Sequence, residues 1–227
     1  VAEVAEFSRR AQERARSPLP LCADYEDGLA SHVGGGTAFP SNMGLGAAND
    51  ESLAFEKGRI TALESRSLGI GWVLAPVVDL ATQPGSPIVN VRSFGTDPAV
   101  VSRMARAAMK GLAAGGALSC VKHFPGHGDS DLDSHLDLPL VEAGREVLVG
   151  RELAPYEALK HDADSVMVGH LAVPALAGDR DTPATLSPAV VSGELRGRIG
   201  FEGLVSTDAL SMRAVTMARM GRGMRRH

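Results

Sequence analysis

Short apolar segments alternate with longer amphipathic segments along this 227-residue chain, and this alternation is the strongest restriction on its fold. Apolar runs of strand length are predicted at five places: 19–23, 71–78, 117–121, 165–168 and 204–206. Helical spacing, capping residues and closing glycines predict helices at 1–16, 49–68, 98–114, 144–161 and 188–198. Consecutive parallel strands need a crossover, so the alternation predicts an α/β fold with a parallel sheet.

An ionisable residue stands at the predicted carboxyl end of each strand. These residues are Asp24, Asp79, His123, His170 and Asp208. Burying a charge without a partner is costly, so packing alone does not account for five such residues at equivalent places. In (β/α)8 barrels and in open α/β sheets, ligands bind at this end of the strands. The pattern therefore predicts a ligand site formed by the strand ends.

The number of strands is too small for a complete barrel. A (β/α)8 barrel has eight strands and about 250 residues, whereas five strands are predicted here. Residues 213–227 are rich in Arg, Met and Gly and predict no further strand. We therefore expect a TIM-barrel type fold that is incomplete and truncated at both ends, with a partial barrel over 1–212 and an atypical basic tail over 213–227.

The composition favours a small ligand over a polyanionic partner. The formal net charge of −4 gives no reason to expect nucleic acid, which binds clustered Lys and Arg, and no obligate protein partner is evident. No segment approaches the run of about 20 apolar residues that spans a bilayer.

Cys22 and Cys120 each lie inside a predicted strand, where a free Cys behaves as a small buried apolar residue. Unpaired thiols favour a reducing compartment, so a cytoplasmic location is expected. Val1 does not begin a signal peptide; because it is not Met, the chain is expected to begin inside a longer protein, and a targeting segment ahead of it stays open.

The segment KHFPGHGDSDLDSHLDLP, residues 122–139, concentrates the polar chemistry of the chain. Asp133 and His135 are two residues apart, so in an extended loop the carboxylate can orient the imidazole as a proton donor and acceptor. The alternatives are turn capping in a solvated loop and metal binding by His123, His127, Asp129, Asp133 and His135. No recognisable ligand spacing supports a metal, and we expect neither a metal nor a cofactor.

Four residues have both a structural and a functional interpretation. Asp208 can cap the next helix or act as a nucleophilic carboxylate. Arg92 and the pair Lys122–His123 can simply bound strands and turns, or they can donate hydrogen bonds to the hydroxyls of a bound sugar.

Together these motifs resemble glycoside hydrolase family 3, in the branch that contains bacterial β-N-acetylglucosaminidases. The resemblance runs from about Leu21 to Met212. It is carried by KHFPGHGDSDLDSHLDLP and by FPSNMGLGA, APVVDL, NVRSFGTDP, VMVGHLAVPAL, ATLSP and GFEGLVSTDALSM, which begin at 39, 75, 90, 166, 184 and 200. One departure is Asp24–Ala30, which lacks the Arg of the family pattern DxEGGRV.

The resemblance implies a (β/α)8 barrel and hydrolysis with retention through a covalent glycosyl-enzyme intermediate. It implies Asp208 as nucleophile and His135, assisted by Asp133, as acid/base. Sugar-contacting positions fall on Asp24, Arg92, Lys122 and His123, and His170 matches by position alone.

The function that follows from this resemblance is a retaining β-N-acetylglucosaminidase. It would act on terminal β-linked N-acetylglucosamine in peptidoglycan fragments, as in peptidoglycan recycling, or in chito-oligosaccharides. The alternatives are a β-N-acetylglucosaminide phosphorylase, a β-glucosidase and an inactive sugar-binding fragment.

Overall fold

The structure is a computed structural model, and it describes residues 1–130 and 137–215. Five parallel strands order the described part of the chain: β1 (Cys22–Ala23), β2 (Trp72–Val73), β3 (Val121–Phe124), β4 (Ser165–Val168) and β5 (Leu204–Thr207). β1 pairs with β2, and β3, β4 and β5 pair in that order. Isolated parallel bridges from Trp72 to Leu118 and from Val77 to Lys122 connect the two groups. The predicted parallel α/β organisation is confirmed, but a closed barrel is not formed by the residues that the structure describes.

The strand boundaries differ from the prediction in one place that matters for the site. The segment 165–168 is a strand as predicted, whereas the third strand begins at Val121 and includes Lys122 and His123. All four residues of β3 are buried. Polar residues at consecutive positions obscured this strand, because a buried polar side chain is stable in a strand only when partners elsewhere in the fold bind it.

The two cysteines are free, as predicted, but they lie in different environments. Cys120 is buried, whereas Cys22 is exposed, so the prediction that both are buried was wrong for Cys22. β1 has only two residues and pairs with β2 alone, and Cys22 is therefore left at the edge of a short sheet.

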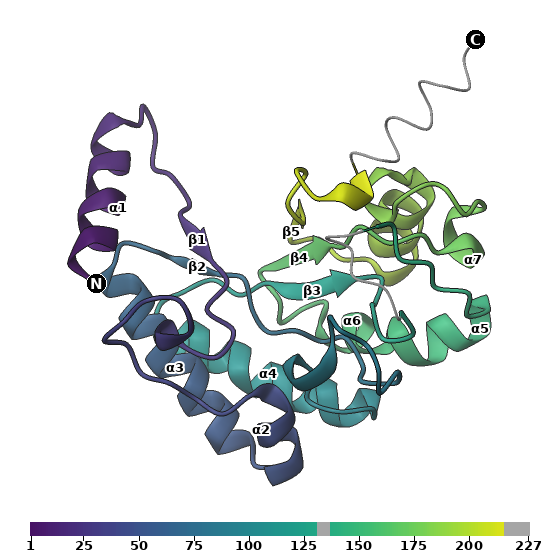
Figure 1. The fold of residues 1–227 in the computed structure, drawn as a ribbon, viewed down its shortest axis with the longest axis horizontal. Coiled ribbons are helices and arrows are strands. Elements are labelled where there is room, and N and C mark those ends of the chain that lie inside the picture. Colours follow the sequence, from purple (N-terminus) through teal and green to yellow (C-terminus); the bar gives the residue numbers. More distant parts are fainter. Residues whose placement is uncertain (131–136, 216–227) are drawn as a thin grey trace.

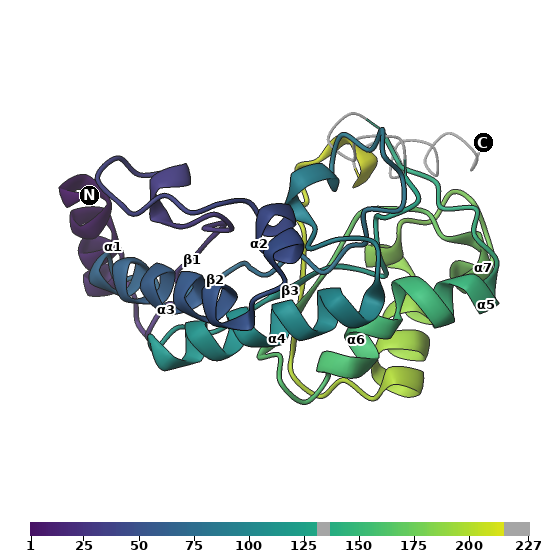
Figure 2. The same cartoon turned by 90° about the horizontal axis from the view of Figure 1, so that it is seen from below.

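The α-helices of the described residues are α1 (Ala2–Arg14), α2 (Asn42–Ala48), α3 (Glu51–Ser67), α4 (Pro98–Ala114), α5 (Arg145–Val147), α6 (Ala154–Leu159) and α7 (Pro174–Ala177). Of these, α3, α4 and α6 cover one side of the strands. Figure 1 shows α3 and α4 below β1–β3, and Figure 2 shows α3, α4 and α6 side by side on that face. Asp50 and Asp97 cap α3 and α4 by accepting backbone N–H bonds, and α4 has its predicted bounds. No helix in the described ranges has the length and apolar character needed to cross a bilayer.

Two glycines let α3 and α4 approach closely. A Cβ on Gly58 would lie 2.2 Å from the carbonyl oxygen of Ala108, and one on Gly111 would lie 2.0 Å from that of Phe55. Any side chain at these positions would separate the helices, and this packing anchors the two crossovers that precede β2 and β3.

The region predicted as one helix over 144–161 is interrupted. After α5, a wide helical turn from Leu148 to Glu152 (η3) precedes α6, which begins with Ala154 and Pro155. Pro155 has no N–H to continue the regular hydrogen-bond ladder, so the break falls just before it. The turn directs Glu152 into the protein interior, where it is 1% exposed.

The core lies between β3, β4 and these helices. Phe124 and Tyr156 pack edge to face with ring centroids 5.0 Å apart, and Leu148, Leu153 and Leu159 are completely buried beside them. Burial of each such side chain contributes about 1.5–3 kcal/mol, so the strand that carries Lys122 and His123 is held by one of the best-packed parts of the fold.

Candidate active site

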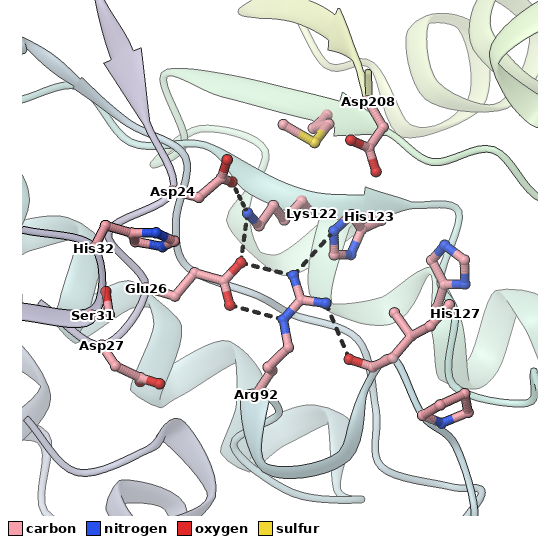
Figure 3. Close-up of a pocket in the computed structure, with 13 residues that line it drawn as sticks. Asp24, Glu26, Asp27, Ser31, His32, Arg92, Lys122, His123, His127 and Asp208 are labelled. Atoms are coloured by element: carbon pink, nitrogen blue, oxygen red, sulfur yellow. Dashed lines mark hydrogen bonds and ion pairs between the residues drawn. The ribbon is translucent and has the colours of Figure 1, made fainter. Parts of the chain in front are cut away.

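A cavity of about 470 Å³ opens at the carboxyl ends of the strands. Its wall includes Asp24 after β1, Arg92 from the loop after β2, Lys122 and His123 of β3, Met167 of β4 and Asp208 after β5. Figure 3 shows these polar side chains converging from strands that are far apart in sequence. The structure thus brings together five of the seven site residues expected from the sequence. The other two, Asp133 and His135, lie outside the described residues.

Two cations and two carboxylates form one side of the cavity, and we call this group the clamp: Asp24, Glu26, Arg92 and Lys122. The Lys122 ammonium donates to Asp24 Oδ1 at 2.6 Å and lies 2.7 Å from Glu26 Oε1. The Arg92 guanidinium donates two bonds to Glu26, at 2.8 and 2.7 Å. This network fixes the donors and acceptors that hydroxyl groups of a ligand would meet (Figure 3).

The clamp keeps its charges despite burial. Burial by itself raises the pKa of Glu26, but the hydrogen bonds and charges of Arg92 and Lys122 outweigh it, so the pKa of Glu26 lies well below the ordinary value. For Lys122 burial lowers the pKa, and the opposing charges of Glu26 and Asp24 raise it above the ordinary value. The Lys122 side chain is only 2% exposed, so its charge depends on these two carboxylates.

A buried carboxylate orients the histidine next to the clamp. Asp79 is 1% exposed; its Oδ2 lies 2.7 Å from Nδ1 of His123, and its Oδ1 accepts the backbone N–H of His127 at 2.7 Å. Because the carboxylate favours a proton on Nδ1, Nε2 of His123 is left as an acceptor, 3.4 Å from Arg92.

The groups around Asp79 favour the ionised form of its carboxylate. Burial raises the pKa of Asp79, but the charges of His123 and His127 and their hydrogen bonds lower it to about 2. Burial lowers the pKa of His127 to about 4, so this imidazole is neutral at neutral pH.

Asp208 lies opposite the clamp. It directly follows β5, is half-buried, and its Oδ1 accepts the backbone N–H of Ala209 at 2.7 Å. Burial raises its pKa, but the charge of His123, the Ala209 hydrogen bond and the charges of His170 and Lys122 lower it below the ordinary value. Asp208 is therefore an ionised carboxylate that faces a set of donors, which is the state a nucleophile requires.

His170 supports the loop that carries Asp208 and does not line the cavity. Its Nδ1 lies 2.6 Å from Thr185 Oγ1, and its Nε2 lies 3.0 Å from the carbonyl oxygen of Ala209. The ring is completely buried, so both nitrogens are occupied by contacts within the protein.

A second polar network lies behind the clamp. The ammonium of Lys57 on α3 is buried and donates to Asp27 Oδ1 at 2.8 Å, Pro40 O at 3.0 Å and Asn42 Oδ1 at 2.9 Å. The amide of Asn42 in turn donates to the carbonyl oxygen of Arg92 at 2.9 Å. The loop after β1, the start of α2 and the backbone of Arg92 are thus fixed by one buried cation.

Glu26 also lines the cavity, and the sequence analysis did not name it, whereas Asp79 was expected at a strand end and His127 was considered as a metal ligand alone. Glu26 stands two residues after Asp24, the same spacing that drew attention to Asp133 and His135, so the signal was available. Within the described ranges, no group of three or more His, Cys, Asp or Glu side chains is arranged to hold a metal ion.

A carboxylate opposite a clamp of paired charges, at the carboxyl ends of parallel strands, is the arrangement of an active site in proteins of the β/α class. The sequence matches the glycosyl hydrolase family 3 N-terminal domain over residues 1–223. The chain belongs to this family.

Several curated relatives are named β-hexosaminidases. The chain is 37% identical over 222 residues to the β-hexosaminidase of Xylella fastidiosa (strain M23), covering 94% of this chain and 65% of that protein. It is 39% identical over 212 residues to the β-hexosaminidase LpqI of Mycobacterium tuberculosis, covering 90% of this chain and 54% of that one. The chain therefore spans only part of the length of these relatives.

Two solved structures resemble the fold equally well. A family 3 β-N-acetylglucosaminidase from Paenibacillus matches with a TM-score of 0.90 and 41% identity, covering 95% of this chain and 42% of that chain. The β-glucoside phosphorylase BglX in complex with 2FGlc also matches with a TM-score of 0.90, at 32% identity, covering 96% of this chain and 41% of that chain.

Proposed function

We propose that the chain carries the catalytic site of a retaining β-N-acetylglucosaminidase that removes terminal β-linked N-acetylglucosamine. The observation that carries this proposal is the position of the ionised Asp208 opposite the clamp, on the wall of one cavity. The β-hexosaminidase names of the curated relatives support the choice of substrate class.

In the proposed first step, a carboxylate oxygen of Asp208 attacks the anomeric carbon, and the bond from that carbon to the leaving oxygen breaks. The leaving oxygen takes a proton from the imidazolium of His135, which Asp133 orients. The clamp and His123 hold the sugar hydroxyls, so the anomeric carbon is presented to Asp208 and not to bulk water.

In the second step, the neutral imidazole of His135 takes a proton from water, which attacks the anomeric carbon. The bond to Asp208 breaks, and the sugar leaves with its original configuration. The roles of Asp133 and His135 rest on the sequence resemblance. The sugar-binding roles of Asp24, Arg92, Lys122 and His123 are supported by their common cavity.

The test is turnover of an aryl β-N-acetylglucosaminide by the chain and by its Asp208→Asn variant. Loss of the nucleophile should lower kcat by about 1,000-fold, which corresponds to about 4 kcal/mol of transition-state stabilisation. The matched control is Glu202→Gln, which changes an exposed carboxylate near β5. Retention of wild-type turnover by Asp208→Asn would refute the assignment.

A second candidate function is phosphorolysis of the same bond, which the structural match to a β-glucoside phosphorylase favours. A histidine acid/base places no second negative charge beside an approaching phosphate, so repulsion is smaller than with a carboxylate. Comparison of the products with and without inorganic phosphate decides between the two, because a glycosyl phosphate forms only by phosphorolysis. An aryl β-glucoside in the same assay tests the β-glucosidase alternative.

The biological setting belongs to the proposal as well. Peptidoglycan fragments and chito-oligosaccharides both carry the proposed terminal sugar, and the two free cysteines are compatible with a reducing, cytoplasmic setting. Release of N-acetylglucosamine from each substrate class can be compared by chromatography.

A further inference from the structure

A buried carboxyl group lies behind the turn that follows β3. Glu152, at the end of η3, is 1% exposed, and its Oε1 accepts a bond from Arg151 Nε at 2.8 Å. Its Oε2 is buried and has no hydrogen-bond partner among the described residues. A buried polar atom of this kind is costly, so the position calls for an explanation beyond packing.

This carboxyl group fills the inside of the turn formed by Gly126, His127 and Gly128. A Cβ added to Gly126 would lie 3.0 Å from Glu152 Oε2, and a Cβ added to Gly128 would lie 2.8 Å from the same oxygen. Gly126 also has a φ of +120°, which disfavours other residues. Glu152 therefore limits the space for a side chain at both glycines, and at Gly128 the carbonyl oxygen of Leu80, 2.6 Å from the same Cβ position, limits it further.

The residue next to Glu152 holds the end of the same turn. Arg151 forms an ion pair with Asp129, and Thr82 Oγ1 donates to Asp129 Oδ1 at 3.0 Å. On the cavity side, Asp79 accepts the backbone N–H of His127. The turn is therefore held by Glu152, by Arg151 through Asp129, and by Asp79. Of these three contacts, the one with Asp79 comes from the cavity side.

We propose that Glu152 and Arg151 are positioning residues that set the path of the chain from β3 through residues 126–129. This inference rests on the proposed function, because the sequence that follows the turn carries Asp133 and His135. Neither Glu152 nor Arg151 is on the cavity wall, so they act on the catalytic step through the turn and not by contact with the sugar.

The surroundings of Glu152 are consistent with this role. Burial raises its pKa to about 7; Arg151 opposes the increase, whereas Asp79 and Asp129 add to it. Tyr156 also faces this group, and its own pKa is raised by burial and by the charges of Asp79 and Glu152. At neutral pH the turn is therefore packed against a carboxyl group that is partly protonated.

The test compares Glu152→Ala, Glu152→Gln and the control Glu146→Gln, which changes an exposed carboxylate on neighbouring α5. With an aryl β-N-acetylglucosaminide, Glu152→Ala should lower kcat about tenfold or more and leave KM within about twofold, because the clamp is intact. Glu152→Gln keeps the shape and should stay within about threefold of wild type. An increase in KM at constant kcat, or equal behaviour of Glu152→Ala and Glu146→Gln, would overturn the inference.

A second readout separates this inference from the proposed function. The ring signals of His127 in a proton–nitrogen NMR spectrum should shift in Glu152→Ala and stay in place in Glu146→Gln, whether or not the chain turns over the substrate. Unchanged His127 signals in Glu152→Ala would contradict the positioning role of Glu152. If Glu152→Ala lacks a cooperative thermal transition, Asp129→Asn removes the Arg151 contact from the opposite side and should give the same kcat loss; wild-type kcat in that variant would count against the proposal.

Discussion

The Nδ1 atom of His123 lies 2.7 Å from Oδ2 of Asp79, a residue 44 positions earlier in the chain. This contact determines which imidazole nitrogen is free to accept a bond in the cavity. It also connects the turn that contains His127 to the clamp, because the other oxygen of Asp79 accepts the His127 N–H.

Asp79→Asn should weaken sugar binding. An Asn side chain can donate to Nδ1 of His123, which would leave a proton on Nε2 pointing at the Arg92 guanidinium, 3.4 Å away. We expect KM to rise by about tenfold, equivalent to about 1.4 kcal/mol. Steady-state kinetics with the aryl β-N-acetylglucosaminide measures KM, and an NMR titration with N-acetylglucosamine measures the sugar affinity, with Glu202→Gln as the control. An affinity equal to wild type would show that the tautomer of His123 does not matter.

Acid should destabilise the fold through Asp79. Because its pKa is about 2 when folded and near the ordinary value when unfolded, the unfolded state binds more protons as the pH falls. The contribution of about 2 kcal/mol is complete above about pH 4 and is lost as the pH falls toward 2. Urea midpoints of wild type and Asp79→Asn, measured between these pH values, should converge at the acidic end; a constant difference would contradict this origin.

Glu152 should act in the opposite direction. Its folded pKa is raised to about 7, so the folded state holds the proton that the unfolded state has already released. Stability is lost as the pH rises from about 4.5 to 7, by up to about 3 kcal/mol, and Glu152→Gln should remove this loss. Thermal midpoints of the two proteins are expected to agree near pH 4.5 and to separate at pH 8 in favour of the variant. Equal midpoints at pH 8 would argue for an ordinary Glu152 pKa.

Lys57→Met should destabilise the clamp through the network that fixes the Arg92 backbone. The substitution keeps the length of the side chain but removes the cation that Asp27, Pro40 and Asn42 share. Leaving the buried Asn42 oxygen, with the partly buried Asp27 and Pro40 oxygens, without this donor costs about 1–3 kcal/mol. Because Asn42 holds the Arg92 backbone, we also expect a higher KM with little change in kcat.

Arg59→Met on the same helix is the control, since within the described residues Arg59 forms its ion pair with the exposed Glu56 nearby. Differential scanning calorimetry and steady-state kinetics on both variants provide the two measurements. A wild-type KM in Lys57→Met would show that the buried network does not influence ligand binding in the cavity.

The sequence predicted the fold and the site correctly where the local pattern of residues is enough to determine the structure. The parallel β/α order could be predicted from apolar periodicity, and Asp208 and Asp24 could be placed at strand ends because both directly follow apolar runs. Lys122 and His123 were expected after their strand but lie within it, since periodicity cannot reveal partners contributed by Asp24, Glu26 and Asp79.

Other features depend on long-range contacts that no local pattern contains. The break before Pro155 could be predicted, but the inward direction of Glu152 depends on the wide turn and on two glycines some 25 residues earlier. The exposure of Cys22 depends on how few residues of β1 pair with β2. The open sheet, in contrast, was expected from the number of predicted strands, and the described residues form no closed barrel.

The position of Lys122 and His123 inside β3 links ligand affinity to the opening of the sheet. A sugar-binding group on a loop can be released by local motion, but the proposed donors Lys122 and His123 lie in β3, which pairs with β4 and with the segment after β2. Amide hydrogen exchange of residues 121–124 should therefore slow in proportion to sugar occupancy, as expected when a ligand binds only the closed state. The sugar affinity and the exchange rates of these β3 amides would then depend on the same equilibrium, the opening of the sheet.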